Sequence, residues 1–112
     1  MSLPPMKPLS DQVSACGQLS AEHMKTLHAE GFASLICNRP DGEEPGQPTA
    51  ASLRAAAEAA GLEFYFVPFA PASPSPTLAE DFSAAMAQAT RPTIAFCRSG
   101  MRSERLFAVT QG

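Results

Sequence analysis

The sequence predicts an α/β fold in three layers: a mainly parallel sheet of four or five strands with helices on both faces. Short apolar runs alternate along the chain with segments of helical periodicity. The apolar runs lack an in-and-out alternation, which is typical of strands covered on both faces. The 112 residues carry no internal repeat and no composition change that would mark a domain boundary. We therefore expect one domain over residues 1–112.

The N-terminal region gives the weakest pattern. Residues 1–11 contain three prolines and are expected to form a loose lead-in, with residues 12–18 as a short edge strand. Ser20 suits the N-cap of a helix over residues 21–30. Gly31 is placed to end that helix in the left-handed conformation.

Three strands and two helices are expected in the rest of the chain before Cys97. Thr49 and Thr77 are expected to cap the two helices, and Gly61 to end the first of them. The loops are rich in proline, which excludes regular structure there. In chain order the expected elements are strand 32–37, loop 38–48, helix 50–60, strand 62–67, loop 68–76, helix 78–89 and strand 92–96.

Composition excludes several classes of function. The net charge is −3 and the pI about 5.2, with eight Lys and Arg, so no basic stripe for nucleic acid is expected. No run reaches the length of a membrane span and the start lacks the pattern of a signal peptide, so we expect a cytoplasmic protein without membrane contact. The three cysteines form no CxxC pair, and no metal or cofactor is expected.

The candidate reactive centre is the segment that follows the last strand. Cys97 comes directly after residues 92–96 and is followed by a turn and a short helical pattern to about residue 109. Such a turn points backbone N–H groups inward, and with the positive helix end they stabilise an anion. The same field is expected to lower the pKa of Cys97 into the range of about 3.5 to 7.5. The expected oxyanion-binding loop consists of Arg98, Ser99, Gly100, Met101 and Ser103.

Arg102 is the expected second catalytic residue, because its guanidinium can grip an oxyanion with two hydrogen bonds. Gly100 lets the backbone turn without a side chain in the way. Arg39 is a candidate for a second positive charge, with an ordinary strand-ending turn as the alternative. Cys37 ends an apolar strand and Cys16 has no polar cluster beside it, so both are expected to be structural.

Three motifs carry a resemblance to a known family: Gly17-Gln18-Leu19-Ser20, Asn38-Arg39-Pro40-Asp41-Gly42-Glu43-Glu44 and Cys97-Arg98-Ser99-Gly100-Met101-Arg102-Ser103. The chain resembles the phosphatase-like domain of bacterial beta-lactamase-hydrolase-like proteins, also described as a sulfur transferase family with a dual-specificity-phosphatase fold. The resemblance covers nearly the whole chain. It implies that Cys97 is the nucleophile, that Arg102 is the oxyanion ligand, and that the loop with Arg39 and Asp41 lies beside the pocket.

The resemblance leaves two chemistries open. Four residues separate Cys97 from Arg102, one fewer than in tyrosine and dual-specificity phosphatases, and Phe96 stands where those enzymes often have His. Loop 68–76, where such phosphatases carry an acidic proton donor, has no acidic residue. Acids in loop 38–48 are the remaining candidates for a proton donor. The shorter loop is similar to that of rhodaneses.

The leading hypothesis is therefore a sulfurtransferase that forms a Cys97 persulfide from thiosulfate or a persulfide donor. The first alternative is a phosphatase that forms a phosphocysteine, with a phosphoprotein as substrate. The second is a non-catalytic module that senses an oxyanion or a persulfide. Fused members of the family suggest a sulfide-oxidising enzyme as partner, and the oligomeric state is left open.

Overall fold

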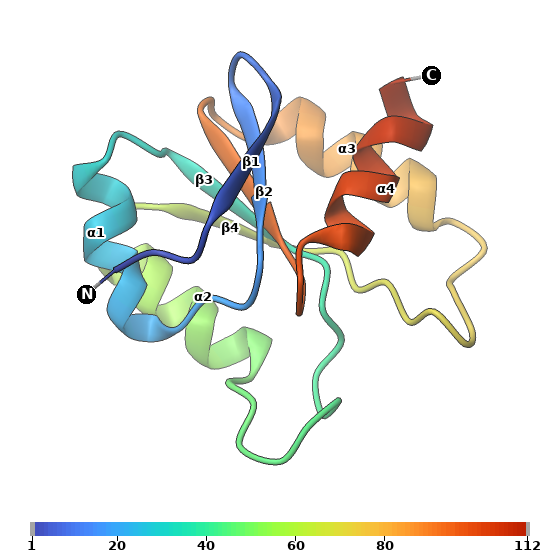
Figure 1. Cartoon of the computed structure of the whole chain (residues 1–112), viewed down its shortest axis with the longest axis horizontal. Helices are drawn as coiled ribbons and strands as arrows, with labels where there is room; N and C mark the ends of the chain where they lie inside the picture. The colour runs from blue at the N-terminus through green and yellow to red at the C-terminus, as the bar shows by residue number, and fades with distance from the viewer. Residues whose placement is uncertain (1, 112) are drawn as a thin grey trace.

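The computed structural model describes residues 2–111, and its centre is one five-stranded sheet (Figure 1). The strand order is β1-β2-β5-β3-β4. The pair β1 and β2 is antiparallel, and the other neighbours are parallel. This confirms the predicted mainly parallel α/β sheet. The strands are β1 (Met6–Ser10), β2 (Val13–Cys16), β3 (Ser34–Cys37), β4 (Glu63–Phe66) and β5 (Thr93–Phe96).

Helices cover both faces of the sheet and complete three layers (Figure 1). One face packs against α1 (Met24–Ala29) and α2 (Ala50–Ala59), which follow the 3-10 turn η1 (Ala21–His23). The other face packs against α3 (Leu78–Gln88) and α4 (Met101–Gln111). No helix within residues 2–111 is long and apolar enough to cross a membrane.

The central strand β5 shows why the apolar runs do not alternate. All four of its residues are buried. Ile94 and Phe96 join the core beneath α1 and α2, whereas Ala95 joins the core beneath α3 and α4. Because both faces are covered, every position of the strand must avoid charge.

The N-terminal expectation was wrong. The expected loose lead-in over residues 1–11 contains the strand β1, so β2 lies inside the sheet, between β1 and β5, and is not an edge. Pro8 is tolerated because β1 is itself the edge strand, where a missing N–H breaks no inner ladder. A register shift between Pro8 and Ser10 marks an irregularity in this pair.

The helix ends follow the sequence signals at Gly31, Thr49 and Gly61 but not at Thr77, and the helix expected over residues 21–30 begins as the 3-10 turn η1 before α1. Thr49 Oγ accepts a hydrogen bond from Ser52 N at 3.1 Å and caps α2. Gly31 and Gly61 have φ of 97° and 89°, as expected of residues that end a helix in the left-handed conformation. Thr77 makes no such cap, because its hydroxyl donates to the Asp81 carboxylate instead.

Candidate active site

The carboxyl ends of β2, β5 and β3 bring the three sequence motifs together. Cys97 N donates to Cys16 O at 3.4 Å, and Gln18 N donates to Arg98 O at 3.2 Å. On the other side, Asn38 N donates to Phe96 O at 2.8 Å. The loop that begins at Cys97 is therefore held from both neighbouring strands.

The loop turns sharply before α4, and Gly100 makes the turn fit. Its φ is 94°, a conformation that other residues rarely adopt. A Cβ at this position would lie 3.2 Å from the backbone carbonyl of Cys16. Gly17 is equally tight, since a Cβ there would lie 3.0 Å from Arg98 O. Two glycines thus allow the loop and the end of β2 to touch through their backbones.

The Cys97 sulfur sits inside a cup of backbone N–H groups. Cys97 is 0% exposed, and Gly100 N donates to its Sγ at 3.0 Å. Burial raises the pKa of this thiol, but hydrogen bonds from the backbone N–H groups of Ser103, Ser99, Arg102 and Gly100 outweigh it and bring the pKa below its ordinary value. The cup therefore favours a thiolate at the start of α4.

Arg102 is locked in place by Glu43. Its Nη1 and Nη2 each donate to one Glu43 carboxylate oxygen at 2.9 Å, and Nη1 also donates to Phe69 O at 2.9 Å. The Glu43 carboxylate first, and the Cys97 thiolate to a smaller extent, raise the pKa of Arg102. The guanidinium thus has a fixed carboxylate as one partner and the Cys97 sulfur as another.

A chain of ion pairs extends from Arg102 across the top of the sheet. Glu43 Oε1 also accepts from Arg39 Nε at 2.9 Å, and Glu44 Oε1 accepts from Arg39 Nη2 at 2.7 Å and from Arg98 Nε at 2.9 Å. The hydrogen bonds from Arg102 and Arg39 lower the pKa of Glu43 despite partial desolvation. Glu43 is thus held as a carboxylate.

The structure places the other predicted loop residues around the cup in different roles. Ser103 is buried, and its hydroxyl donates to Asn38 Oδ1 at 2.8 Å. Ser99 Oγ accepts from Met101 N at 3.3 Å. Met101 is 67% exposed and faces solvent, not the sulfur. The Arg98 side chain is mostly exposed and meets Glu44 at the rim.

Arg39 and Asp41, the two residues predicted to lie beside the pocket, have different contacts in the structure. Arg39 is buried, and its guanidinium donates to Gln18, Glu43 and Glu44, so it supports the carboxylate that holds Arg102. Asp41 lies outside this network, because its Oδ1 accepts from Ala50 N at 2.7 Å at the start of α2. Asp41 thus satisfies a free N–H at the N-terminus of α2, beside the N-cap Thr49.

Sequence reasoning missed two residues of the site. Glu43 was considered only as a proton donor, yet it is the partner of Arg102. Asn38 was noted only within a motif, yet it is a buried hub: its Nδ2 donates to Val67 O at 2.8 Å while its Oδ1 accepts from Ser103. An asparagine directly after a strand that is apolar apart from Ser34 was the available signal for such a hub.

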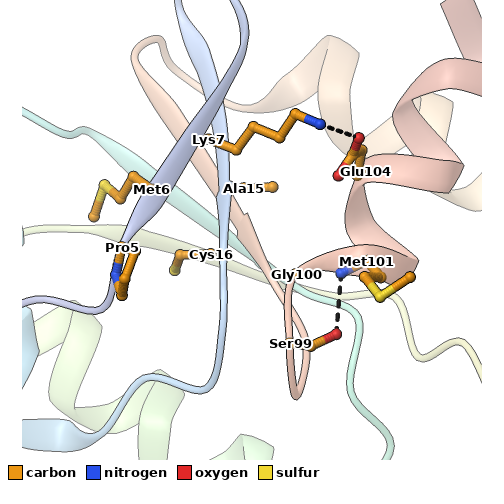
Figure 2. A pocket seen from close by; sticks show the side chains of 9 residues that line it. All are labelled: Pro5, Met6, Lys7, Ala15, Cys16, Ser99, Gly100, Met101 and Glu104. Carbon is orange, nitrogen blue, oxygen red and sulfur yellow. Dashed lines mark hydrogen bonds and ion pairs between the residues drawn. The ribbon is translucent and has the colours of Figure 1, made fainter.

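A shallow pocket of about 180 Å³ lies on the outer side of the loop (Figure 2). It is bounded by β1, the end of β2 and the start of α4, and the Lys7–Glu104 ion pair spans it. Gly100 belongs to its wall, but Cys97 does not. Within residues 2–111 no group of three His, Cys, Asp or Glu side chains is arranged to hold a metal ion.

Comparison with known proteins points to one family. A family model described as "Beta-lactamase hydrolase-like protein, phosphatase-like domain" matches residues 5–112. The beta-lactamase hydrolase-like protein of Agrobacterium fabrum is 36% identical over 105 residues, which are 90% of this chain and 23% of that protein. Its counterpart in Xylella fastidiosa is 32% identical over 92% of this chain and 24% of that protein. The chain thus spans about a quarter of the length of these relatives.

A solved structure is similar to the chain in both sequence and fold. A candidate phosphatase from Neisseria meningitidis is 30% identical and has a TM-score of 0.82 over 93% of this chain and 74% of that one.

Proposed function

We propose that this chain, which belongs to the family of phosphatase-like domains of beta-lactamase hydrolase-like proteins, is a cysteine-dependent transferase of sulfane sulfur. Two observations support the chemistry of the site. The Cys97 sulfur accepts hydrogen bonds from backbone N–H groups, which favour its thiolate, and Arg102 lies beside it. A thiolate with oxyanion donors around it can attack a sulfur or phosphorus centre that carries oxygens.

The proposed reaction has two steps. The Cys97 thiolate attacks the outer sulfur of thiosulfate, the S–S bond breaks, and sulfite leaves with its two negative charges, which gives the Cys97 persulfide anion. A thiophilic acceptor such as cyanide then takes the outer sulfur as thiocyanate and restores the thiolate. Arg102 and the loop N–H groups stabilise the sulfonate oxygens in the first step. Neither step needs a proton.

The state of Glu43 is the observation that favours sulfur over phosphate. Hydrolysis of a phosphomonoester with a poor leaving group requires a proton donor. Glu43 pairs with two arginines and its pKa is lowered, so it is a poor donor at neutral pH. Asp41 is bound to the start of α2. Sulfur transfer asks only for the anion stabilisation that the cup offers.

A second candidate function is phosphatase activity, which the comparisons favour. The matched family is phosphatase-like, and the similar Neisseria meningitidis protein is a candidate phosphatase. Here the thiolate attacks phosphorus, an alkoxide or phenolate leaves, and water hydrolyses the phosphocysteine. Without a strong acid, the reaction is expected only with good leaving groups such as nitrophenolate.

A paired assay separates the two candidates. Purified protein is given thiosulfate with cyanide in one assay and an aryl phosphate in the other, each beside Cys97→Ser. We expect thiocyanate production that Cys97→Ser abolishes. Turnover of aryl phosphate without thiocyanate would establish the phosphatase instead. Oxyanion binding without either turnover would point to a sensing module and overturn both enzyme assignments.

A further inference from the structure

Asn38 forms hydrogen bonds with its backbone N–H and C=O and with both ends of its side-chain amide. Its N–H donates to Phe96 O at 2.8 Å, and its C=O accepts from Phe69 N at 2.8 Å. In the side chain, Nδ2 donates to Val67 O at 2.8 Å, and Oδ1 accepts from the Ser103 hydroxyl at 2.8 Å. Asn38 is 0% exposed, so solvent does not compete for these partners. The residue thus joins the end of β5, the chain after β4 and the first turn of α4.

Ser103 connects Asn38 with the reactive sulfur. Its hydroxyl donates to Asn38, whereas its backbone N–H donates to the Cys97 sulfur. Burial raises the pKa of the Cys97 thiol, and among the backbone N–H groups that together outweigh burial, the one of Ser103 has the largest effect. Hydrogen bonds weaken steeply when their angle is lost, so the direction of this N–H matters.

The titratable and charged groups that act on the Cys97 sulfur come from three elements. Arg102 of α4 carries the positive charge, and Glu43 holds it independently of Asn38. Cys16 of β2 and Cys37 of β3 are thiols whose pKa burial raises to about 12, so both are neutral at pH 7. A change at the Asn38–Ser103 contact therefore acts on the sulfur through the helix N–H groups.

We propose that Asn38 is a positioning residue for the nucleophile: through the Ser103 hydroxyl it holds the first turn of α4 so that the Ser103 N–H points at the Cys97 sulfur and keeps it a thiolate. This role rests on the proposed function in taking the Cys97 thiolate as nucleophile, but not on whether sulfur or phosphorus is attacked. Without the contact, the helix start can shift, the N–H loses its aim, and the protonated thiol is favoured.

The test measures the pH dependence of Cys97 alkylation by iodoacetamide in Asn38→Ala, Ser103→Ala and the double variant. Each single variant should raise the midpoint by about one pH unit, because a hydrogen bond to a charged group amounts to roughly a tenfold change or more. Both substitutions remove one and the same contact, so the double variant should show the shift of a single one. Ser103→Thr keeps the hydroxyl and should keep the wild-type midpoint.

Ser34→Ala is the matched control. The Ser34 and Thr93 hydroxyls lie 2.8 Å apart, and both residues are 0% exposed. They begin β3 and β5, so this contact joins the same two strands at the end away from Cys97. Ser34→Ala should lower the urea midpoint of unfolding much as Ser103→Ala does, yet leave the Cys97 alkylation midpoint unchanged. An equal alkylation shift in Ser34→Ala would overturn the proposal, because lost stability alone would then explain the effect.

Unchanged alkylation midpoints in both single variants, or shifts that add in the double variant, would also overturn it. If circular dichroism shows that Asn38→Ala or Ser103→Thr is unfolded, the comparison of Ser103→Ala with Ser34→Ala decides alone.

Turnover provides a second readout and separates this proposal from the proposed function. At a pH below the wild-type midpoint, kcat/KM of Ser103→Ala for thiosulfate should be about tenfold lower than that of wild type, because the thiolate fraction is tenfold lower. It should recover at a pH above the shifted midpoint, and a loss that persists there would contradict a role in ionisation. If wild type itself does not turn over thiosulfate, the proposed sulfur transfer fails, and the alkylation midpoints still decide the role of Asn38.

Discussion

Glu43 decides where the Arg102 guanidinium points. Its carboxylate takes both terminal nitrogens of Arg102 and is itself held by Arg39, which is 4% exposed. Charge-assisted pairs of this two-pronged kind fix geometry as well as adding energy. We interpret Glu43 as a positioning residue that keeps Arg102 beside Cys97.

Glu43→Gln is therefore expected to weaken catalysis by way of Arg102. Hydrogen bonds to charged groups contribute about 1.5 to 3 kcal/mol, so kcat/KM for thiosulfate should fall about tenfold or more. Glu44→Gln is the matched control, because Glu44 contacts Arg39 and Arg98 but not Arg102. The kcat/KM of Glu44→Gln should stay within about twofold of the wild-type value, because this variant loses no hydrogen bond to Arg102. An unchanged or higher kcat/KM in Glu43→Gln would contradict the positioning role.

The sequence predicted the position of Cys97 before a helix but not the residue that holds Arg102. Cys97 follows a buried strand and precedes a helix, so local pattern alone places it at an anion site. Glu43 and Arg102 are 59 residues apart, and their contact depends on how loop 38–48 folds over the strand ends. No periodicity or capping signal encodes that pairing.

At the scale of elements, the turn into α4 depends on backbone contact between the loop and β2. Gly100→Ala should disturb this turn for two reasons. A φ of 94° is strained for any residue with a Cβ, and the new Cβ would lie 3.2 Å from the Cys16 carbonyl. The variant should lose about 2 to 4 kcal/mol of unfolding free energy in urea titrations. It should also lose Cys97 reactivity.

Gly46→Ala provides the control for backbone strain. Its φ is 78°, and a Cβ there would meet nothing within 4 Å. Gly46→Ala should lower the free energy of unfolding by only about 1 kcal/mol and leave Cys97 reactivity unchanged. Equal losses in the two variants would show that contact with β2 does not shape the loop.

The main difference between the predicted and observed elements is strand β1, which contains a proline. Strands 32–37 and 92–96 were recognised because burial on both faces demands continuous apolar runs, which the sequence displays. Strand 62–67 was recognised from a similar run, although β4 is a partly buried edge strand that contains Glu63. Strand β1 was missed because its burial is partial and it contains Pro8. An edge strand is defined by its partner, and the partner is a matter of tertiary structure.

At the scale of the whole molecule, β1 closes the edge of the sheet nearest the loop. It pairs with β2 from Met6 to Ser10, and Lys7 reaches Glu104 on α4. Deletion of residues 1–10 should lower the midpoint of thermal unfolding by several degrees, because it exposes the β2 edge. Lys7→Ala should barely change it, since both ends of that ion pair are well exposed. An unchanged midpoint in the deletion would contradict a structural role for β1.

The three thiols of the molecule respond to its overall architecture in opposite ways. Burial raises the pKa of Cys16 and of Cys37 to about 12, whereas the N–H groups at the start of α4 bring that of Cys97 below its ordinary value. The fold therefore selects one thiolate among three buried sulfurs. Every function considered for the site depends on this selection.

The pH dependence of iodoacetamide alkylation, read cysteine by cysteine by mass spectrometry, tests that selection most directly. Because the pKa of Cys97 is lowered, its rate should reach half of its plateau below the pH of about 8.5 that governs a free cysteine. Cys16 and Cys37 should stay unmodified across that range. A Cys97 midpoint at or above the free-cysteine value, or equal labelling of all three, would contradict the account.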